Sequence, residues 1–468
     1  MSTEEFDLTP KAVPTVRTRH RRIVTPIPPA GSGDIIRRMQ QVEPRSMGGT
    51  LPVVWDHAVD YQVFDPFGNC WIDLSSTIFV ANAGHSNPAV IRAIEEQIRR
   101  NLLHNYCFPS EIRLRAAETL LAHCPEPLRK VFFLSTGSET SECILKLARL
   151  HGQRQGPARN GIICFEGSMH GRTLGAQMMG GNAAAKAWIA HPDPEIYHLS
   201  FPWRFRCPWR ESDSHACDAS CFHKSLTQLE KNGVNLQSIA AIVIEPYQGW
   251  GALFFPASYV QAARRWADEH NALLCFDEVQ SGCGRTGRFF AFEHYGVRAD
   301  LVGLGKGLAS SMPVSAVLGR SDVMDLPPIG SMSSTHSGHP LACAAVIANL
   351  EEFKRQELLQ KAQNIGAILQ TCLHDLQKKF SDHILSVEGQ GMVYALIITK
   401  PGTSNEDAAL ADRVAEKAMQ KGVLVVHTGR GSIKIGPPLT IPEEAIREAV
   451  TVLDESFSES LRERGARA

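Results

Sequence analysis

Short hydrophobic runs alternate with longer segments of mixed polarity through the middle of the chain. Residues 138–152 place Ile144, Leu145, Leu147 and Ala148 on one broad face, a spacing typical of an amphipathic helix. Short apolar runs bounded by polar residues are instead typical of strands buried on both faces. The sequence predicts such strands at residues 131–134, 161–165, 240–244, 273–276 and 301–302.

This alternation indicates an α/β fold, with a parallel sheet covered by helices on both faces. Ligands of such sheets bind beyond the carboxyl ends of the strands. After about residue 336 the pattern changes to a long helical stretch at 342–376, shorter strand-like pieces and a closing helix at 442–464. We therefore expect an N-terminal segment (1–65), a large domain (66–335) and a small C-terminal domain (336–468).

The composition is that of an ordinary globular protein. Of the 468 residues, 43% are hydrophobic and 21% are charged, and the formal net charge is −1. Near-neutral charge gives no reason to expect a nucleic-acid or membrane partner. No segment approaches the ~20 apolar residues of a membrane-spanning helix, and residues 1–32 lack the apolar core of a signal peptide. We expect a cytoplasmic protein.

An aspartate and a lysine each follow one of the predicted strands. Asp277 ends the run at 273–276, and Lys306 lies in a glycine-rich segment after the run at 301–302. Pyridoxal phosphate chemistry needs this pair, because the lysine forms a Schiff base and the aspartate keeps the pyridine nitrogen protonated. Either residue alone is weak evidence, since strand-ending aspartates often cap helices or form turns and loop lysines are usually solvated.

A segment between a predicted strand and a predicted helix, Thr136-Gly137-Ser138-Glu139, is suited to bind a phosphate. Gly137 permits close backbone approach, Ser138 offers a hydroxyl, and the helix start presents free N–H groups. The alternative is an ordinary Ser/Thr helix cap. Polar segments also follow two other strands, at residues 166–173, which include His170, and 244–249, which include Glu245.

Taken in order, six motifs resemble the class III pyridoxal-phosphate-dependent aminotransferases of the 4-aminobutyrate, ornithine and acetylornithine type. The resemblance runs from about Gly68 to the C-terminus. The matching segments are 73–75 with 82–88, 136–139, 169–173, 245–246, 276–280 through 305–306, and 334–343.

The resemblance implies fold type I of the pyridoxal-phosphate-dependent transferases. This fold has a large cofactor-binding domain around a mainly parallel seven-stranded sheet and a small C-terminal α/β domain. The resemblance also implies a homodimer with shared active sites, in which the N-terminal segment contributes to the small domain and to dimer contacts. Thr335 would reach the phosphate bound by the other subunit.

The resemblance also assigns roles to single residues. Lys306 would carry the cofactor and move a proton between substrate and cofactor, and Asp277 would pair with the pyridine nitrogen. The other cofactor contacts would be Gly137 and Ser138 at the phosphate, Val279 and Met169 at the ring faces, Gln280 at the ring hydroxyl, and His170 and Glu245 nearby.

Three positions depart from the family's pattern. Met169 stands where the family stacks an aromatic residue on the ring. Trp250 stands where 4-aminobutyrate and ornithine aminotransferases carry a glutamate that masks a carboxylate-binding arginine. Lys434 replaces that arginine, which keeps the charge but loses the bidentate geometry; Arg430 is a nearby alternative. We treat Trp250 and Lys434 as candidate substrate contacts.

Residues 201–224 concentrate Cys207, Cys217 and Cys221 with His215. Three thiols and a histidine could complete a tetrahedral zinc shell. Their spacing matches no recognised zinc module, so we expect a substrate-shaping or interface loop and no metal. A redox-labile disulfide is a further alternative.

The expected function is transfer of an amino group from a primary amine or ω-amino acid, such as 4-aminobutyrate, to a 2-oxo acid. The mechanism would be ping-pong, through pyridoxamine phosphate. One alternative is an amino acid racemase or epimerase of the same family, because the sequence does not fix which substrate bond is cleaved. The other is a non-catalytic binding protein. The Lys306→Ala variant would distinguish the two classes, because an enzyme should lose its turnover whereas a binding protein should keep almost all of its function.

Overall fold

The computed structural model describes residues 6–210, 212 and 215–466, so the outer ends of the expected terminal domains and part of segment 201–224 lie outside the described residues. Contacts divide the chain into two compact units. The larger unit comprises Pro88–Gly249 and Leu253–Gln356; the smaller comprises the chain up to Asn87, Trp250–Ala252 and the chain from Glu357 onward. These units do not test the domain boundaries expected after residues 65 and 335, which stay a prediction.

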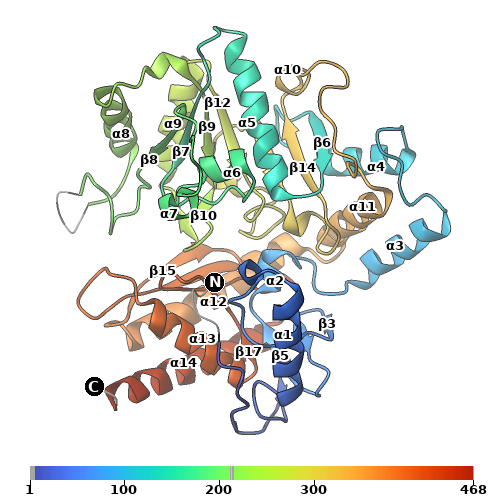
Figure 1. Ribbon diagram of the computed structural model, residues 1–468, viewed down its shortest axis with the longest axis vertical. Coiled ribbons are helices and arrows are strands. Elements are labelled where there is room, and N and C mark those ends of the chain that lie inside the picture. The colour runs from blue at the N-terminus through green and yellow to red at the C-terminus, as the bar shows by residue number, and fades with distance from the viewer. Residues whose placement is uncertain (1–5, 211, 213–214, 467–468) are drawn as a thin grey trace. The chain divides into compact units, whose positions relative to one another are not determined.

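A seven-stranded sheet forms the centre of the larger unit (Figure 1). Neighbouring strands in this sheet are parallel except at Ser315–Gly319, which is antiparallel to both of its neighbours. This confirms the predicted mainly parallel seven-stranded sheet. In spatial order the strands are β6 (Lys130–Leu134), the antiparallel β14 (Ser315–Gly319), β13 (Leu301–Leu304), β12 (Leu273–Asp277), β9 (Ile239–Ile244), β7 (Gly161–Phe165) and β8 (Ile196–Leu199).

Helices pack on this sheet through apolar faces. Helix α5 (Gly137–Gln153) packs against β9, β13 and β14, and its buried Ile144 and Leu147 join a core with strand residues such as Val243. Helix α9 (Ala257–Glu269) packs on β9 and β12. The remaining helices and short strands of this unit are α3 (Pro88–Arg99), α4 (Glu111–Leu121), α6 (Leu174–Met179), α7 (Ala183–Lys186), α8 (Ala219–Lys231), α10 (Ser321–Met324), α11 (Pro340–Arg355), β10 (Tyr247–Gln248) and β11 (Leu253–Phe254).

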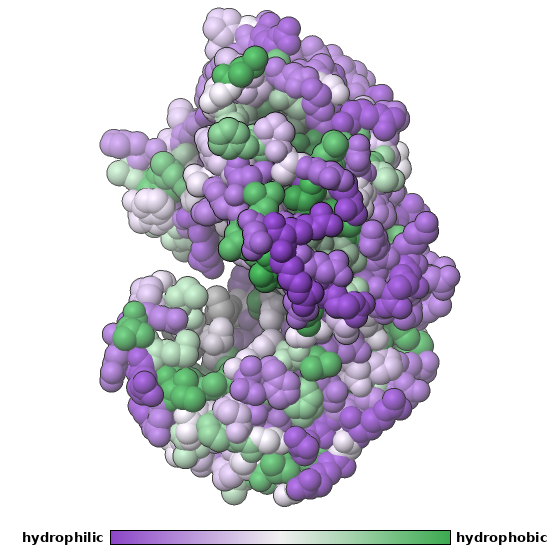
Figure 2. Space-filling view, turned by 90° about the vertical axis from the view of Figure 1, so that its right-hand side faces the viewer, coloured by the Kyte–Doolittle hydropathy of each residue, from purple (hydrophilic) through white to green (hydrophobic). Residues whose placement is uncertain are grey.

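Several large hydrophobic side chains are exposed between and on helices α3 and α4. The exposed fractions are 53% for Leu103, 74% for Phe108 and 57% for Leu114. Figure 2 faces the side on which Figure 1 draws these helices, and it shows small hydrophobic groups among predominantly polar residues. No helix within the described part of the chain is long and apolar enough to cross a membrane.

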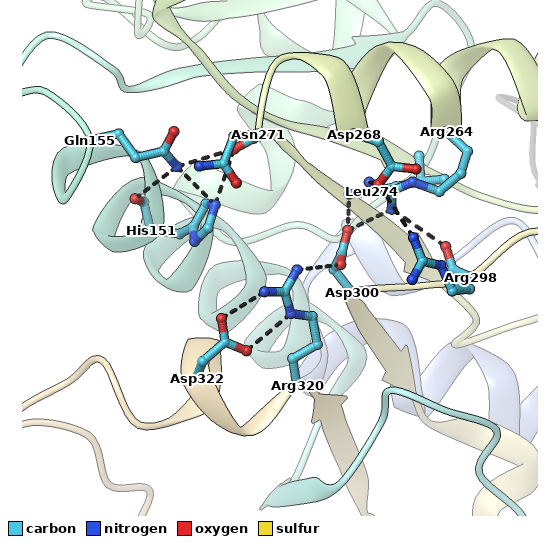
Figure 3. Close-up of polar contacts among 10 residues, drawn as sticks. All are labelled: His151, Gln155, Arg264, Asp268, Asn271, Leu274, Arg298, Asp300, Arg320 and Asp322. Atoms are coloured by element: carbon cyan, nitrogen blue, oxygen red, sulfur yellow. Dashed lines mark hydrogen bonds and ion pairs between the residues drawn. The ribbon is translucent and has the colours of Figure 1, made fainter.

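At the amino-terminal end of β13, the buried Asp300 gathers several hydrogen bonds (Figure 3). Its Oδ2 accepts from Arg264 Nη1 at 2.6 Å and from the Leu274 N–H at 2.8 Å. Its Oδ1 accepts from Arg320 Nη1 at 3.0 Å, and Arg320 also pairs with Asp322 at 2.7 Å. One carboxylate thereby joins α9, β12 and the residue that follows β14.

The smaller unit contains two sheets. Strands β15 (Ile384–Gln390), β16 (Val393–Ile398), β19 (Ser432–Ile435) and β18 (Val426–His427) form one. The other has β1 (Val16–Arg17), β2 (Arg22–Ile23), β5 (Cys70–Asp73), β4 (Gln62–Phe64) and β3 (His57–Val59), with β17 (Val423–Leu424) beside β5. Its helices are α1 (Ala30–Val42), α2 (Ser76–Phe79), α12 (Leu358–Lys379), α13 (Ala408–Gln420) and α14 (Glu443–Gly465), the last confirming the predicted closing helix.

The long helical stretch predicted at 342–376 is confirmed, but it consists of two helices, α11 and α12. Glu357 lies between them in the left-handed conformation, with φ 52° and ψ 43°. Residues 350–360 contain neither glycine nor proline, so the usual signals for a helix end are missing. Helix α11 packs on α3 and α4 within the larger unit.

Candidate active site

A carboxylate and an imidazole meet at the carboxyl edge of the seven-stranded sheet. Asp277 is the last residue of β12, and His170 lies in the segment after β7. His170 Nδ1 is 2.8 Å from Asp277 Oδ2, and both residues are buried. Burial alone would lower the pKa of His170, but the carboxylates of Asp277 and Glu245 outweigh burial and raise it. The imidazole is therefore suited to hold a proton against the Asp277 carboxylate.

Glu245, directly after β9, connects the segments on either side of it. Its Oε2 accepts from the Met169 N–H at 2.9 Å, and its Oε1 accepts from the Gly249 N–H at 3.2 Å. Burial raises the pKa of Glu245 to about 7; His170 opposes this rise and Asp277 adds to it. Because Met169 precedes His170, Glu245 helps to hold the imidazole in place.

Lys306 follows β13, the neighbour of β12, so its amine starts from the same edge as Asp277. The residue is half-buried and has a left-handed φ of 43°, a strained conformation for a side chain other than glycine. Burial lowers the pKa of Lys306, although the negative charges of Asp277 and Glu245 oppose that shift. A lysine with a lowered pKa can act as a nucleophile near neutral pH.

Val279 and Gly137 approach each other so closely that any side chain at position 137 would force Val279 to move. A Cβ atom on Gly137 would lie 2.7 Å from Val279 Cγ1. The Val279 N–H donates to Asp277 Oδ1 at 3.1 Å, which fixes the turn after the aspartate. The first turn of α5 thus lies against the segment that follows Asp277.

Gln280 lies beside Glu245. A Cβ atom on Gly249 would be 3.2 Å from Gln280 Nε2 and 3.1 Å from Glu245 Oε1, so the glycine lets the two side chains approach. The Tyr247 hydroxyl donates to the Gln280 carbonyl at 3.3 Å. Three predicted cofactor contacts, Glu245, Val279 and Gln280, therefore lie in one connected group with Asp277.

The start of α5 combines a helix cap with a site for an anion. Thr136 Oγ1 accepts from the Glu139 N–H at 3.3 Å, and Glu139 Oε2 accepts from the Thr136 N–H at 2.8 Å, which is a capping box. Amides in the first helical turn have no acceptor within the helix, so those of Gly137 and Ser138 suit a phosphate. Ser138 Oγ also accepts from the Arg172 N–H at 3.2 Å. The helix cap is therefore present, and the phosphate site at Gly137 and Ser138 stays a prediction.

Thr335 lies in an exposed segment near the start of α5. Its carbonyl accepts from His104 Nε2 at 2.8 Å, and the neighbouring Ser334 Oγ donates to Glu139 Oε1 at 3.2 Å. Thr335 itself is exposed in the single chain. Its position thus leaves its surface accessible to another molecule.

The candidate substrate contacts Trp250 and Lys434 belong to the smaller unit. The Arg430 guanidinium lies 4.2 Å from the centroid of the Trp250 ring, and Ser432 Oγ donates to the Trp250 carbonyl at 2.7 Å. Lys434, on the buried strand β19, places its Nζ 4.2 Å from the centroid of the Phe79 ring. Cations at these distances from aromatic faces are attracted to them.

Sequence reasoning missed Phe79 as part of this group. Residues Ser76–Phe79 form a left-handed turn, with φ 68° at Phe79, where residues other than glycine are disfavoured. A Cβ atom on Gly436 would lie 1.8 Å from the Phe79 ring, so glycine there makes room for it. Strained turns of this kind concentrate at functional sites, but the sequence contains no glycine to mark this one.

Glu278 also received no role from the sequence. It accepts from the Ala291 N–H at 2.9 Å and from the Phe292 N–H at 2.7 Å, so it fixes the loop that follows the site. Burial raises the pKa of Glu278 to about 8. The sequence signal that could have identified Glu278 was the acidic pair Asp277-Glu278 at the end of a buried strand.

The donor set around Lys306 fits pyridoxal phosphate. The half-buried Lys306 and the buried Asp277 share one edge of the sheet, Val279 offers an apolar surface, and the Gly137 amide starts a helix 17 residues long. Among the described residues, the buried His170 Nε2 has no hydrogen-bond partner, which leaves it able to interact with a bound group.

Comparison with protein families and known proteins supports the same interpretation of the site. A model of the family described as aminotransferase class-III matches residues 45–457. The 5-aminovalerate aminotransferase DavT of Pseudomonas aeruginosa is 33% identical over 91% of this chain and 98% of its own. The 4-aminobutyrate aminotransferase GabT of Escherichia coli is 32% identical, with coverage of 91% and 98%. A leucine/methionine racemase of Thermococcus litoralis is 30% identical, with coverage of 91% and 95%.

Solved structures resemble the whole fold. An ornithine aminotransferase from Toxoplasma gondii aligns with a TM-score of 0.81 at 26% identity, covering 92% of this chain and 96% of its own. An amine transaminase from an uncultivated Pseudomonas species, in its PLP-bound form, aligns with a TM-score of 0.81 at 28% identity, covering 89% and 97%.

Proposed function

Because this chain belongs to the class III aminotransferase family, an enzyme family that depends on pyridoxal phosphate, we propose that it transfers the amino group of an ω-amino acid to a 2-oxo acid. The observation that carries the proposal is the connected group of Lys306, Asp277 and His170 at the carboxyl edge of the sheet. The relatives named for 4-aminobutyrate and 5-aminovalerate support an ω-amino donor.

The bound cofactor would supply a protonated ring that accepts an electron pair from the substrate. In the proposed mechanism, Lys306 would hold the cofactor and, once released from it, would take up and return the proton at the substrate carbon, for which its lowered pKa suits it. Asp277 holds the proton on the ring nitrogen. His170 orients Asp277 through the 2.8 Å hydrogen bond. Glu245 holds the His170 segment in place, and Val279 packs against the ring.

We propose that the phosphate binds at Gly137 and Ser138 and that Thr335 completes this site across a homodimer interface. The exposure of Thr335 supports a contact with a second subunit. The exposed Leu103 and Phe108 offer hydrophobic area for such an interface. Met169 is 49% exposed in the chain and would pack on the ring through its thioether.

Trp250 and Lys434 would select the substrate. Lys434 supplies a positive charge suited to a carboxylate of the substrate, and Phe79 restricts the orientation of its amine. Trp250, held by Arg430, stands where the family's gating glutamate is expected. An arginine stacked on an indole can still turn its edge toward a carboxylate.

A second candidate function is racemisation or epimerisation of an amino acid. The 30% identity to a leucine/methionine racemase over 91% of the chain favours it, as does Trp250 in place of the glutamate. The same lysine serves either reaction, since both begin with removal of the proton on the amino-bearing carbon and differ in where a proton is then returned.

A half-reaction with purified, cofactor-loaded enzyme and no oxo acid tests both candidates. We would add 4-aminobutyrate, 5-aminovalerate, ornithine, leucine and methionine singly, and follow the visible absorption of the bound cofactor. Stoichiometric loss of that absorption with an ω-amino acid, reversed by 2-oxoglutarate, is the expected result. Persistent absorption while leucine or methionine loses optical purity would overturn it in favour of the racemase. Lys306→Ala serves as the inactive control.

A further inference from the structure

Four metal-ligating side chains converge outside the candidate active site. Cys207, His215 and Cys217 lie in the irregular segment between β8 and α8, and Cys221 lies in the first turn of α8. One ligand atom from each residue lies within 4.8 Å of all the others. The segment is separated by more than 50 positions from Asp277, so the sequence alone does not link it to the reacting residues.

Two of the six distances between the ligand atoms match the edges of a tetrahedron around a zinc ion, and all six lie within 4.8 Å. Cys207 Sγ is 3.9 Å from Cys221 Sγ, and Cys221 Sγ is 3.6 Å from His215 Nε2. With Zn–S about 2.3 Å and Zn–N about 2.05 Å, a regular tetrahedron has S–S edges of about 3.8 Å and S–N edges of about 3.6 Å. A disulfide would need the sulfur atoms about 2.05 Å apart, and these cysteines are free thiols.

The surroundings favour a structural site rather than a catalytic one. Cys207, Cys217 and Cys221 have exposed fractions of only 6%, 8% and 1%. Four protein ligands fill a tetrahedral shell, which leaves no position for water or substrate.

Other contacts show what the ion would hold together. Trp209 Nε1 donates to Ser225 Oγ at 3.3 Å, which brings the middle of the loop to α8. Phe201, at the start of the loop, packs edge-on against Phe255 with ring centroids 4.5 Å apart. All four ligands lie between Phe201 and Ser225 in the sequence, so a bound ion would fix the loop to the helix.

We propose that Cys207, His215, Cys217 and Cys221 bind one structural Zn²⁺ ion that fixes the loop between β8 and α8. Thiolate and imidazole ligands in tetrahedral geometry select zinc over the hard cations Mg²⁺ and Ca²⁺. Binding replaces thiol protons by the ion and releases them to solvent. This site departs from our expectation from the sequence that the loop holds no metal, because the irregular spacing hid the convergence.

The test begins with the metal content of the untagged, cofactor-loaded enzyme, purified under reducing conditions without chelator. We expect about one zinc per chain. Cys217→Ser should lose the zinc, whereas Cys372→Ser, which removes a thiol from α12 instead, should keep it. His215→Cys should also keep it, since a four-cysteine site binds zinc equally well, while His215→Ala should not. Limited proteolysis of the loop should accelerate when a chelator removes the ion.

Three results would overturn the proposal. One is a wild-type enzyme that holds less than about 0.1 zinc per chain after incubation with zinc and a reductant. Another is a Cys217→Ser variant that retains full zinc, which would place the ion elsewhere. The third is a count of reactive thiols in the denatured, metal-free protein that falls two short of the 12 cysteines, which would reveal a disulfide instead. The zinc content of the wild-type enzyme tests the proposal even if a variant fails to fold.

Discussion

His170 Nδ1 lies 2.8 Å from Asp277 Oδ2, although 107 positions separate the two residues in the chain. The contact arises because both segments end at the carboxyl edge of one parallel sheet. A buried imidazole in this position fixes the direction of the carboxylate, so we regard His170 as a positioning residue.

His170→Ala should therefore lower kcat by about 10- to 100-fold, the usual cost of losing a residue that orients a reactive group. His170→Asn, which keeps a donor near Asp277, should recover part of this loss. The position of the cofactor's visible absorption band should shift in the first variant and less in the second. His374→Ala on α12 is the control. A loss of stability without any spectral change would show that His170 has only a packing role.

The pH dependence of cofactor attachment should report the pKa of Lys306. Burial lowers this pKa below the ordinary value of 10.5, so the free amine forms at lower pH than in solution. The attachment rate of cofactor-free enzyme should then rise with pH and level off below 10.5. Because Glu245 raises the pKa of Lys306, Glu245→Ala should shift the curve to still lower pH.

Stopped-flow measurement of the visible absorption, over a series of pH values, would give both curves. Glu269→Ala, which removes an exposed carboxylate of α9, is the matched control and should leave the curve unchanged. A shift of the Glu245→Ala curve to higher pH would contradict the electrostatic argument.

Gly137→Ala should weaken cofactor binding. The new Cβ atom would lie 2.7 Å from Val279 Cγ1. Overpacking of this kind lowers the free energy of unfolding by about 1–3 kcal/mol. The dissociation constant should rise by up to about 150-fold, the value reached when the whole cost falls on the cofactor-bound state. Gly156→Ala is the matched control, because a Cβ atom there meets no atom within 4 Å. Equal affinities of the two variants, measured by equilibrium titration, would refute the close contact.

Lys434→Ala should raise KM for 2-oxoglutarate by about 10- to 100-fold and change kcat little, since a charge-assisted hydrogen bond contributes about 1.5–3 kcal/mol. Lys434→Arg should keep KM near the wild-type value. Steady-state kinetics with Lys378→Ala, an exposed lysine of α12, provides the control. An unchanged KM in Lys434→Ala would remove this lysine from the substrate site.

The sequence predicted those parts of the fold that depend on local hydrophobic pattern. Continuous apolar runs located β7, β9, β12 and β13, and their ends located Asp277 and Lys306. Strand β8 was missed because its four residues include His198 and Tyr197 and are mostly half-buried, as expected for an edge strand. Strand β14 was missed because Ser315–Gly319 is short and begins and ends with small residues.

Long-range contacts were harder to predict. The pairing of His170 with Asp277 depends on the order of strands in space, which hydrophobic runs do not specify. The convergence of Cys207 with Cys221 depends on the path of an irregular loop. The break at Glu357 carries no glycine or proline, so no local signal in the sequence marks it.

The Asp300 cluster lies at the end of the sheet opposite to Lys306. It ties α9, β12 and the end of β14 together there through contacts that involve none of the residues proposed to face the substrate. Heat tolerance and substrate choice can then change separately during evolution or engineering. Replacements at the carboxyl edge could retune the enzyme for a new amine while the melting temperature stays almost constant.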